Sequence, residues 1–335
     1  MRWLLRSIAI IILLAIVGVG YQLLGMMTDR EQFLPPGELV DVGDYRLHLY
    51  CTGKGSPTVV LDAMGLGWSV YWTKIQPAIA EVTRVCSYDR AGFGWSDTGP
   101  PPRTGERMAA ELHQLLARGG IGGPYLLVGH SLGGFVARLY RHAHPSEVAG
   151  IVLVDAGHEA QFGQEPFQKF AAPGKFVFPI VRGMTAVGLT RLLFSLEKLP
   201  PLFTTQESSV PPDVRPLLRF GWMQSRYFKT MAEEGAALEA TGMLAARTGS
   251  LGDLPVTVVT ASGPTWWPDL PPNLDPVAFR EMWLRLQSQL TTLSTESRQV
   301  FADHSSHFVN FDQPEVIVAA VRQMIDRVRM PSAAL

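Results

Sequence analysis

Ser131 stands in a sequence setting that favours nucleophilic chemistry. The residues around it read Gly129-His130-Ser131-Leu132-Gly133, which is the pattern Gly-x-Ser-x-Gly. An apolar run over residues 125–128 precedes the pattern, and apolar residues at helical spacing follow it as far as Pro145. We therefore expect a strand, a sharp turn and a helix, with Ser131 at the turn. A Cβ at Gly129 or Gly133 would strike the neighbouring elements of such a turn.

The helix that is expected after Ser131 supplies a second chemical feature. Its first backbone N–H groups have no partner within the helix, and the N-terminus of a helix attracts negative charge. The backbone N–H of Leu132 would therefore point at the same spot as the serine. This group is suited to stabilise an oxyanion that forms during attack by Ser131.

The elements that must position this turn follow an alternating order. Helical patterns separate most of the buried, strand-like runs, and such an order predicts a mostly parallel central sheet with helices on both faces. Strands are expected at residues 38–42, 45–51, 58–62, 84–88, 125–130, 150–154, 254–260 and 297–301. Further helices are expected at residues 72–82, 106–118, 279–293 and 314–328.

The alternation stops between residues 157 and 251, where the chain is helical and loop-like with paired prolines. We interpret this segment as a helical cap that is inserted after the sixth strand. The expected organisation is therefore a membrane anchor or signal peptide at 1–28, a linker at 29–37, the first part of the α/β core at 38–156, the cap at 157–251 and the second part of the core at 252–330.

The first 28 residues differ from the rest of the chain. No charged residue occurs from Ser7 to Met27, whereas Arg2 and Arg6 precede this run. About 20 apolar residues in a helix suffice to cross the hydrocarbon core of a bilayer. The leading arginines favour a cytoplasmic N-terminus and a body on the extracytoplasmic side. The alternative is a secreted protein whose signal peptide is cleaved near residues 18–20.

The composition limits the classes of molecule that the protein is expected to bind. Of 335 residues, 18% are charged and the net charge is −1, and no Lys/Arg-rich run occurs, so we expect no nucleic-acid partner. No phosphate-binding or dinucleotide-binding glycine motif and no set of metal ligands at a familiar spacing is found, so no cofactor and no metal are expected. Cys51 and Cys86 sit in apolar, strand-like stretches and are expected as buried free thiols, with a single disulfide as the alternative.

Three motifs together resemble the α/β-hydrolase superfamily, most closely its serine-nucleophile branch of bacterial membrane-anchored or exported hydrolases. They are the run 129–134 around the serine, the run Asp89-Arg90-Ala91-Gly92-Phe93-Gly94-Trp95-Ser96-Asp97, and His307 with Pro314 seven positions later. The resemblance covers about residues 39–328. It implies an α/β-hydrolase fold, but this fold hosts esterases, lipases, peptidases and perhydrolases, so it leaves the substrate open.

The resemblance also implies the partners of Ser131. The family order of nucleophile, acid and histidine places the base late in the chain, and the spacing from His307 to Pro314, which recurs in the family, favours His307 over His304. Many relatives carry the acid shortly after the strand that follows the cap, but here no carboxylate occurs there until Asp269. Some members place the acid at the end of the strand before the cap, which favours Asp155 as the residue that orients His307, with Asp269 as the alternative.

The second oxyanion donor is expected in the loop after the third strand, Asp62-Ala63-Met64-Gly65-Leu66-Gly67. The resemblance favours the backbone N–H of Leu66, with that of Met64 as the alternative. Either group would act together with the N–H of Leu132.

The preferred function is hydrolysis of carboxylic esters through an acyl-enzyme on Ser131. Aromatic and aliphatic residues of the cap favour a small-molecule ester with an apolar portion. An amide, peptide or perhydrolase activity on the same residues is one alternative. The other is a non-catalytic, membrane-tethered binding protein that keeps the hydrolase scaffold.

Overall fold

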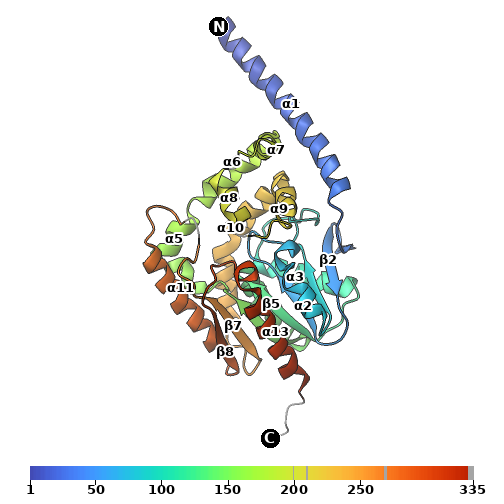
Figure 1. Cartoon of the computed structure of the whole chain (residues 1–335), viewed down its shortest axis with the longest axis vertical. Helices are drawn as coiled ribbons and strands as arrows, with labels where there is room; N and C mark the ends of the chain where they lie inside the picture. Colours follow the sequence, from blue (N-terminus) through green and yellow to red (C-terminus); the bar gives the residue numbers. More distant parts are fainter. Residues whose placement is uncertain (199, 209, 268–269, 331–335) are drawn as a thin grey trace.

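The computed structural model describes residues 1–198, 200–208, 210–267 and 270–330, and an eight-stranded sheet forms its centre (Figure 1). The spatial order of the strands is β1-β2-β4-β3-β5-β6-β7-β8, in which β2 is antiparallel to both of its neighbours, β1 and β4, and all other neighbouring strands are parallel. Their bounds are β1 Glu38–Asp41, β2 Arg46–Thr52, β3 Thr58–Asp62, β4 Val85–Tyr88, β5 Tyr125–His130, β6 Val148–Val154, β7 Val256–Ala261 and β8 Ser297–Ala302.

Helices cover both faces of this sheet, so the strands β3, β4, β5 and β7 are buried along their whole length. The helices α3 (Gly105–Arg118) and α4 (Leu132–Ala143) pack on one face, and α2 (Gln76–Ala80) and α13 (Pro314–Arg329) pack on the other. The helix α11 (Pro276–Leu290) lies beside β7. The expected mostly parallel sheet with two covered faces is confirmed.

The expected helix over residues 72–82 is shorter in the structure. A 3₁₀ turn, Ser69–Trp72, comes first, and α2 begins only at Gln76. Pro77 occupies the first turn of α2, the place in a helix where a residue without an N–H group is tolerated.

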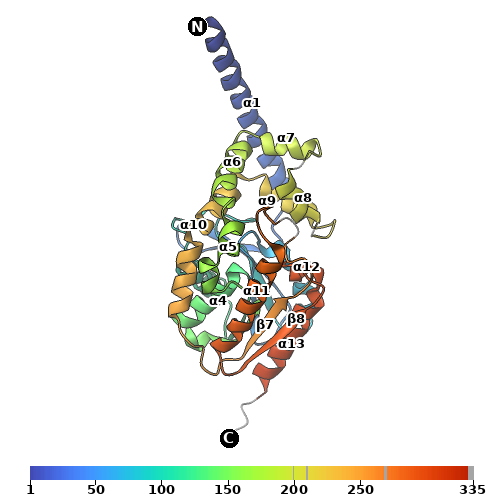
Figure 2. The same ribbon diagram turned by 90° about the vertical axis from the view of Figure 1, so that its left-hand side faces the viewer.

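Six helices lie between β6 and β7, as the cap hypothesis requires: α5 (Glu165–Ala171), α6 (Gly174–Ala186), α7 (Leu189–Ser195), α8 (Pro201–Ser208), α9 (Arg215–Trp222) and α10 (Ser225–Arg247). Figures 1 and 2 show α6 to α9 gathered at one end of the sheet, on the side from which α1 (Arg2–Gln32) projects. The long α10 connects this group to the body, because it packs against α6 at one part and α3 and α4 at another.

Helix α1 is 31 residues long and is almost entirely exposed, with only Gln22 and Asp29 buried. Within the described residues it is the single helix that is long and apolar enough by itself to cross a membrane.

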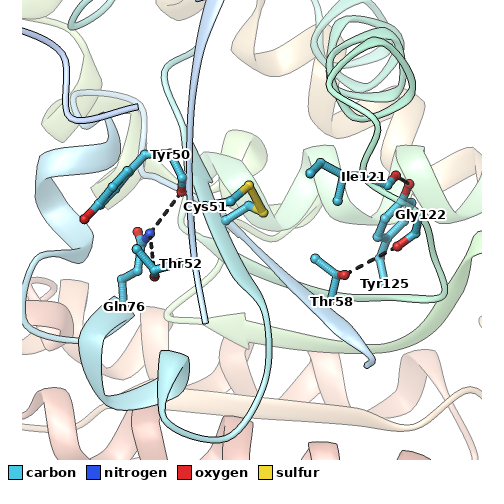
Figure 3. The surroundings of a disulfide bond; sticks show 9 residues. Tyr50, Cys51, Thr52, Thr58, Gln76, Ile121, Gly122 and Tyr125 are labelled. Atoms are coloured by element: carbon cyan, nitrogen blue, oxygen red, sulfur yellow. Dashed lines mark hydrogen bonds between the residues drawn. A yellow bond between two sulfur atoms is a disulfide. The ribbon is translucent and has the colours of Figure 1, made fainter. Parts of the chain in front are cut away.

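The prediction of free thiols at Cys51 and Cys86 is wrong, because the two residues form a disulfide. They lie directly opposite one another in the antiparallel register of β2 and β4, with their Cα atoms 4.0 Å apart. Figure 3 shows the surrounding contacts, in which the amide of Gln76 donates to the carbonyl oxygen of Tyr50 and to Oγ1 of Thr52. The pairing depends on which residues of the two strands face each other, and the sequence alone does not state this register.

Candidate active site

Ser131 lies at a tight turn between β5 and α4, with φ 53° and ψ −113°. A non-glycine residue with positive φ is strained, and such geometry recurs where a serine is presented at the end of a strand. The glycines around it allow close packing. A Cβ on Gly133 would lie 2.6 Å from the carbonyl oxygen of Asp62, and a Cβ on Gly129 would lie 2.7 Å from the nitrogen of Gly134.

Asp155 follows β6, the strand beside β5, and its backbone is also strained at φ 40°. Backbone bonds tie this point to the serine turn: the N–H of Ser131 donates to Val154 and the N–H of Gly157 donates to the carbonyl oxygen of Ser131, both at 3.0 Å. The neighbouring strand ends therefore hold Asp155 close to Ser131.

The carboxylate of Asp155 is completely buried and accepts hydrogen bonds on both oxygens. The indole N–H of Trp283 and the backbone N–H of Ala261 donate to Oδ1 at 2.9 and 3.0 Å. Oδ2 accepts the indole N–H of Trp266 at 2.8 Å and lies 2.6 Å from Nδ1 of His307. A buried charge is tolerated only when it is paired and hydrogen-bonded, and these four donors meet that condition.

His307 lies in the loop that follows β8 and is held at its backbone as well as at its ring. Its N–H donates to the carbonyl oxygen of Trp266 at 2.7 Å, and its own carbonyl oxygen lies 2.9 Å from Nε2 of His130. Because a carbonyl only accepts, His130 donates here. The rings of His130 and His307 are 4.8 Å apart, so the residue next to Ser131 directly supports His307.

The two other histidines near the site differ from His307: His130 is buried and supports His307, whereas His304 is exposed. Burial, with a smaller contribution from nearby His307, lowers the pKa of His130 well below its ordinary value, so the ring stays neutral. His304 is exposed, and its backbone N–H donates to the side chain of Gln313.

The loop after β3 lies against the start of α4 and is fixed by a buried arginine. The Arg90 guanidinium donates to the carbonyl oxygens of Ala63 and Met64, each at 2.7 Å, and to Oδ1 of Asp62 at 2.7 Å. On its other side it donates to Glu234 of α10 at 3.0 Å. Arg90 therefore connects the loop to the cap.

The outer part of the same loop also contacts the cap, because the hydroxyl of Tyr227 donates to the carbonyl oxygen of Leu66 at 2.8 Å. Carbonyls of the loop are thus engaged by the cap and by Arg90. Gly65 and Leu66 are partly exposed, and an added Cβ on Gly65 would lie 3.7 Å from the side chain of Leu132. The loop and the first turn of α4 therefore lie side by side.

Apolar side chains of the cap form one continuous cluster with residues beside the candidate active site, which we call the cap cluster. Met64 of the loop and Phe308, the neighbour of His307, belong to it. The other fully buried members are Trp68, Val70, Tyr71, Phe93, Val181, Phe194, Phe203, Val210, Val214, Leu218, Trp222, Tyr227, Phe228, Met231 and Phe311. The cluster connects the site to the cap helices.

One group of possible metal ligands occurs among the described residues, formed by His113, His144 and Glu147, whose ligand atoms lie within 4.8 Å of one another. The rings of His113 and His144 are stacked at 3.8 Å, and the hydroxyl of Tyr140 donates to Glu147. This group lies beyond the C-terminus of α4, about 18 Å along a 12-residue helix from Ser131, so it is separate from the site.

The family model described as the alpha/beta hydrolase fold matches residues 57–212, a region that includes β3, the serine turn and Asp155. This match identifies the α/β-hydrolase fold in the chain. The solved structures agree. A putative epoxide hydrolase from Pseudomonas aeruginosa superposes with a TM-score of 0.64, at 18% identity, over 88% of this chain and 97% of that one. A thermophilic esterase from Thermogutta terrifontis superposes with a TM-score of 0.60, at 20% identity, over 87% and 98%.

Curated relatives of this α/β-hydrolase occur in fungi and bacteria. An uncharacterised protein of Schizosaccharomyces pombe is 31% identical over 290 residues, which are 74% of this chain and 51% of that protein. The uncharacterised protein YqjL of Bacillus subtilis is 23% identical over 80% of this chain and 83% of its own length. The chain spans about half the length of the first of these relatives. The family and its structural neighbours support a hydrolase.

The structure brings most of the expected site residues of this α/β-hydrolase together. Asp155 and His307 are in direct contact, and Ser131 shares its turn with His130, which supports His307. Asp269 lies outside the described residues. The sequence did not identify Trp266 and Trp283 as hydrogen-bond donors to the carboxylate of Asp155. The only sequence signal for them is that Trp266 stands in the segment after β7, where the family often carries its acid.

Proposed function

We propose that this α/β-hydrolase cleaves carboxylic esters with an apolar portion through an acyl-enzyme on Ser131. The observation that supports this most strongly is the contact between His307 and the fully buried Asp155, placed beside a serine with strained backbone geometry. A strained serine, a buried carboxylate and an imidazole, in this order along the chain, match the requirements of nucleophilic catalysis.

In the proposed mechanism His307 acts as the base. Asp155 engages Nδ1, which leaves Nε2 of the ring to take the proton from the Ser131 hydroxyl as its oxygen attacks the ester carbonyl. The imidazolium then gives this proton to the departing alcohol, and an acyl group stays on the serine. Water attacks the acyl group in the second half of the reaction, again with His307 as base. Asp155 stabilises the imidazolium in both halves.

The negative charge that develops on the carbonyl oxygen requires donors. The N–H of Leu132, at the start of α4, is one candidate, because the first N–H groups of a helix have no partner within it. We propose the N–H of Leu66 as the second donor, with that of Met64 as the alternative. Arg90 holds the carbonyls of this loop, so it indirectly orients the loop N–H groups.

The cap cluster supports an apolar substrate portion. It extends from Met64 and Phe308, both beside the proposed reacting atoms, to cap residues such as Val181 and Phe194. An acyl or alkyl chain seated there would bury apolar surface and gain roughly 0.8 kcal/mol per CH₂ group.

We further propose that α1 anchors the protein with its catalytic body on the extracytoplasmic side. Helix α1 is long and apolar enough to cross a membrane, and Arg2 and Arg6 precede its apolar run. The Cys51–Cys86 disulfide supports the same placement, because disulfides persist in oxidising compartments. Secretion after cleavage of a signal peptide is the alternative.

A substrate panel tests the proposed reaction. Purified full-length protein would be assayed against p-nitrophenyl esters of increasing acyl length and against the matching p-nitroanilides, with Ser131→Ala as the control. Ester hydrolysis that rises with acyl length and is lost in Ser131→Ala is the expected result. Cleavage of the anilides in preference to the esters would contradict it and indicate an amidase.

A further inference from the structure

The cap helices α6 and α7 present apolar side chains outward as well as inward. On the inner side, Val181 and Phe194 are buried in the cap cluster. On the outer side, Phe176 is 73% exposed and Ile180 is 62% exposed. Other exposed large apolar residues of this pair of helices and its ends are Val187, Leu189, Leu192 and Leu196. Exposed apolar side chains gathered on one face are typical of a membrane or interaction surface rather than of a water-facing surface.

The turn between α6 and α7 packs directly against α1. The carbonyl oxygen of Val187 occupies the place that a Cβ on Gly18 would need, and Gly188 approaches Tyr21 and the backbone of Gly18. The two glycines let the two backbones come close. Figures 1 and 2 both show the cap end of the molecule beside the lower half of α1.

A buried polar cluster joins the same two parts further along α1. The Arg191 guanidinium of α7 donates to both carboxylate oxygens of Asp29, at 2.5 and 3.1 Å, and to the side chain of Gln22 at 3.2 Å. Gln22 in turn donates to the carbonyl oxygen of Met223 at 2.6 Å. Gln22 and Asp29 are the buried residues of α1, so this cluster fixes the angle between α1 and the cap.

These contacts set the height of the α6–α7 turn along α1. The charge-free run of α1 ends at Met27, and Gly18 lies nine residues before that end. At 1.5 Å per residue, the turn therefore sits about 13 Å inside the apolar run of the helix. Asp29 and Arg191 lie just outside the run. If α1 crosses a bilayer, the turn between α6 and α7 must lie below the bilayer surface. The ion pair between Asp29 and Arg191 must then lie at that surface.

The charges of this segment fit a lipid surface. Residues 166–196 carry four basic residues and no acidic one. Lys175 and Arg182 are exposed on α6, where long basic side chains can place their charge at the headgroups while their stems cover apolar surface. The positive charges of Lys175 and Arg182 would also attract anionic lipids.

We propose that α6 and α7 form a hairpin that inserts into the outer part of the same bilayer that α1 crosses, held in place by Gln22, Asp29 and Arg191. The segment Glu165–Ala186, which comprises α5 and α6, meets α7 at an angle of 81°, and together they are long and apolar enough for a broken span or for a bent segment that enters and leaves a membrane on one side. The occupant of the exposed apolar face is therefore lipid.

The insertion has a consequence for the substrate, which rests on the proposed ester hydrolysis. A cavity of about 150 Å³ lies within the hairpin region, lined by residues that include Val177, Val181, Phe194 and Phe203. Val181, Phe194 and Phe203 belong to the cap cluster, which extends to Met64 and Phe308. The cavity would seat the distal part of an acyl chain, and the packed apolar side chains of the cap cluster connect its lining to Met64 and Phe308. The substrate class is an amphiphilic ester presented in the membrane.

Depth-dependent fluorescence quenching tests the insertion. Full-length protein with Ile180→Cys would be labelled with an environment-sensitive maleimide and reconstituted into phosphatidylcholine vesicles containing phosphatidylglycerol and a lipid with a doxyl quencher on its acyl chain. The native cysteines are in a disulfide, so the label reports the introduced thiol. Met330→Cys is the matched control, because Met330 is 65% exposed and directly follows α13, which lies at the opposite end of the molecule from α1 (Figure 1). We expect several-fold stronger quenching at residue 180 than at residue 330. Equal quenching at the two sites would overturn the proposal.

Exchanging the charges of Asp29 and Arg191 tests whether their ion pair holds the hairpin in place. Arg191→Asp in the Ile180→Cys background should lower the quenching, and adding Asp29→Arg should restore it. Unchanged quenching in Arg191→Asp would show that the pair does not hold the hairpin. Labelling of each variant by a fluorophosphonate probe reports separately on the serine. A failure of the proposed reaction therefore leaves the depth measurement interpretable, and a failure of insertion leaves the labelling intact.

Discussion

Nδ1 of His307 lies 2.6 Å from Oδ2 of Asp155, although the two residues are 152 positions apart in the chain. The carboxylate stands at the end of β6, the strand next to the serine strand β5. At the end of β7 and in the segment after it, where many relatives carry their acid, this chain instead supplies donors: the N–H of Ala261 and the indole N–H of Trp266 both donate to Asp155. The site is therefore built around a carboxylate that comes before the cap.

Trp283 is expected to support catalysis through Asp155. Its indole N–H donates to Oδ1, and a hydrogen bond to a charged group contributes about 1.5–3 kcal/mol. Trp283→Phe keeps most of the ring but removes this donor, so we expect kcat for ester hydrolysis to fall about tenfold. Trp267→Phe is the matched control, since the ring of Trp267 lies 5.8 Å from His307 but does not donate to Asp155. Equal kcat in the two variants would exclude this role for Trp283.

Arg90→Lys is expected to impair both activity and stability. A lysine cannot reproduce the fork that binds Asp62, Glu234 and the loop carbonyls, so the oxyanion loop loses its fixed position. Losing one oxyanion donor lowers kcat about 10²–10³-fold. Because Arg90→Lys loosens the loop without removing its N–H groups, we expect kcat to fall by up to about 10²-fold. Kinetics with a soluble ester and thermal melting in detergent would measure the two effects.

Arg103→Lys serves as the control for Arg90. Arg103 is an equally buried arginine that binds both carboxylate oxygens of Glu111, and neither residue contacts the oxyanion loop. We expect this variant to lose stability while kcat stays near the wild-type value. A similar loss of kcat in both arginine variants would mean that Arg90 acts through general stability.

The disulfide is expected to stabilise the folded state. Cys51 and Cys86 are 35 positions apart, and closing a loop of this length is worth about 3–4 kcal/mol in the chain-entropy model. Thiol titration of the denatured, unreduced protein should find no free thiol, and the double variant Cys51→Ala with Cys86→Ala should unfold at a lower temperature. Two reactive thiols in protein purified without reductant would contradict the assignment.

Asp89 is expected to make stability depend on pH. Burial alone would raise its pKa, but the adjacent His48 ring and hydrogen bonds from Ser69 and Trp95 lower the pKa below its ordinary value. A carboxyl with a lowered pKa stabilises the folded state above its unfolded-state pKa of about 3.9, and this contribution is lost as the pH falls through the folded-state pKa. The free energy of unfolding of wild type should therefore exceed that of Asp89→Asn at neutral pH.

This difference in unfolding free energy should shrink below about pH 4, where the carboxyl of the unfolded chain becomes protonated. Chemical denaturation in detergent from acidic to neutral pH would measure it. Asp253→Asn is the control, because Asp253 is exposed before β7, and its difference from wild type should not change with pH. A constant difference for Asp89→Asn would remove the assigned pH dependence.

The sequence predicts local features of this molecule better than features that depend on distant contacts. The turn at Ser131 and the strand that ends at Asp155 follow from short apolar runs and glycine spacing, and both occur where expected. The indole donors of Trp266 and Trp283 lie more than 100 positions from Asp155, so no local pattern marks them. The disulfide depends on the β2–β4 register for the same reason.

Covalent labelling with a fluorophosphonate probe, followed by peptide mass mapping, tests whether Ser131 is an activated nucleophile. We expect one adduct on Ser131 in the wild type, none in Ser131→Ala, and labelling slowed by orders of magnitude in His307→Ala and Asp155→Asn. The matched Asp303→Asn, which alters an exposed carboxylate in the loop before His307, should label at the wild-type rate. Folded wild-type protein that takes up no probe, or takes it up on a residue other than Ser131, would contradict the account.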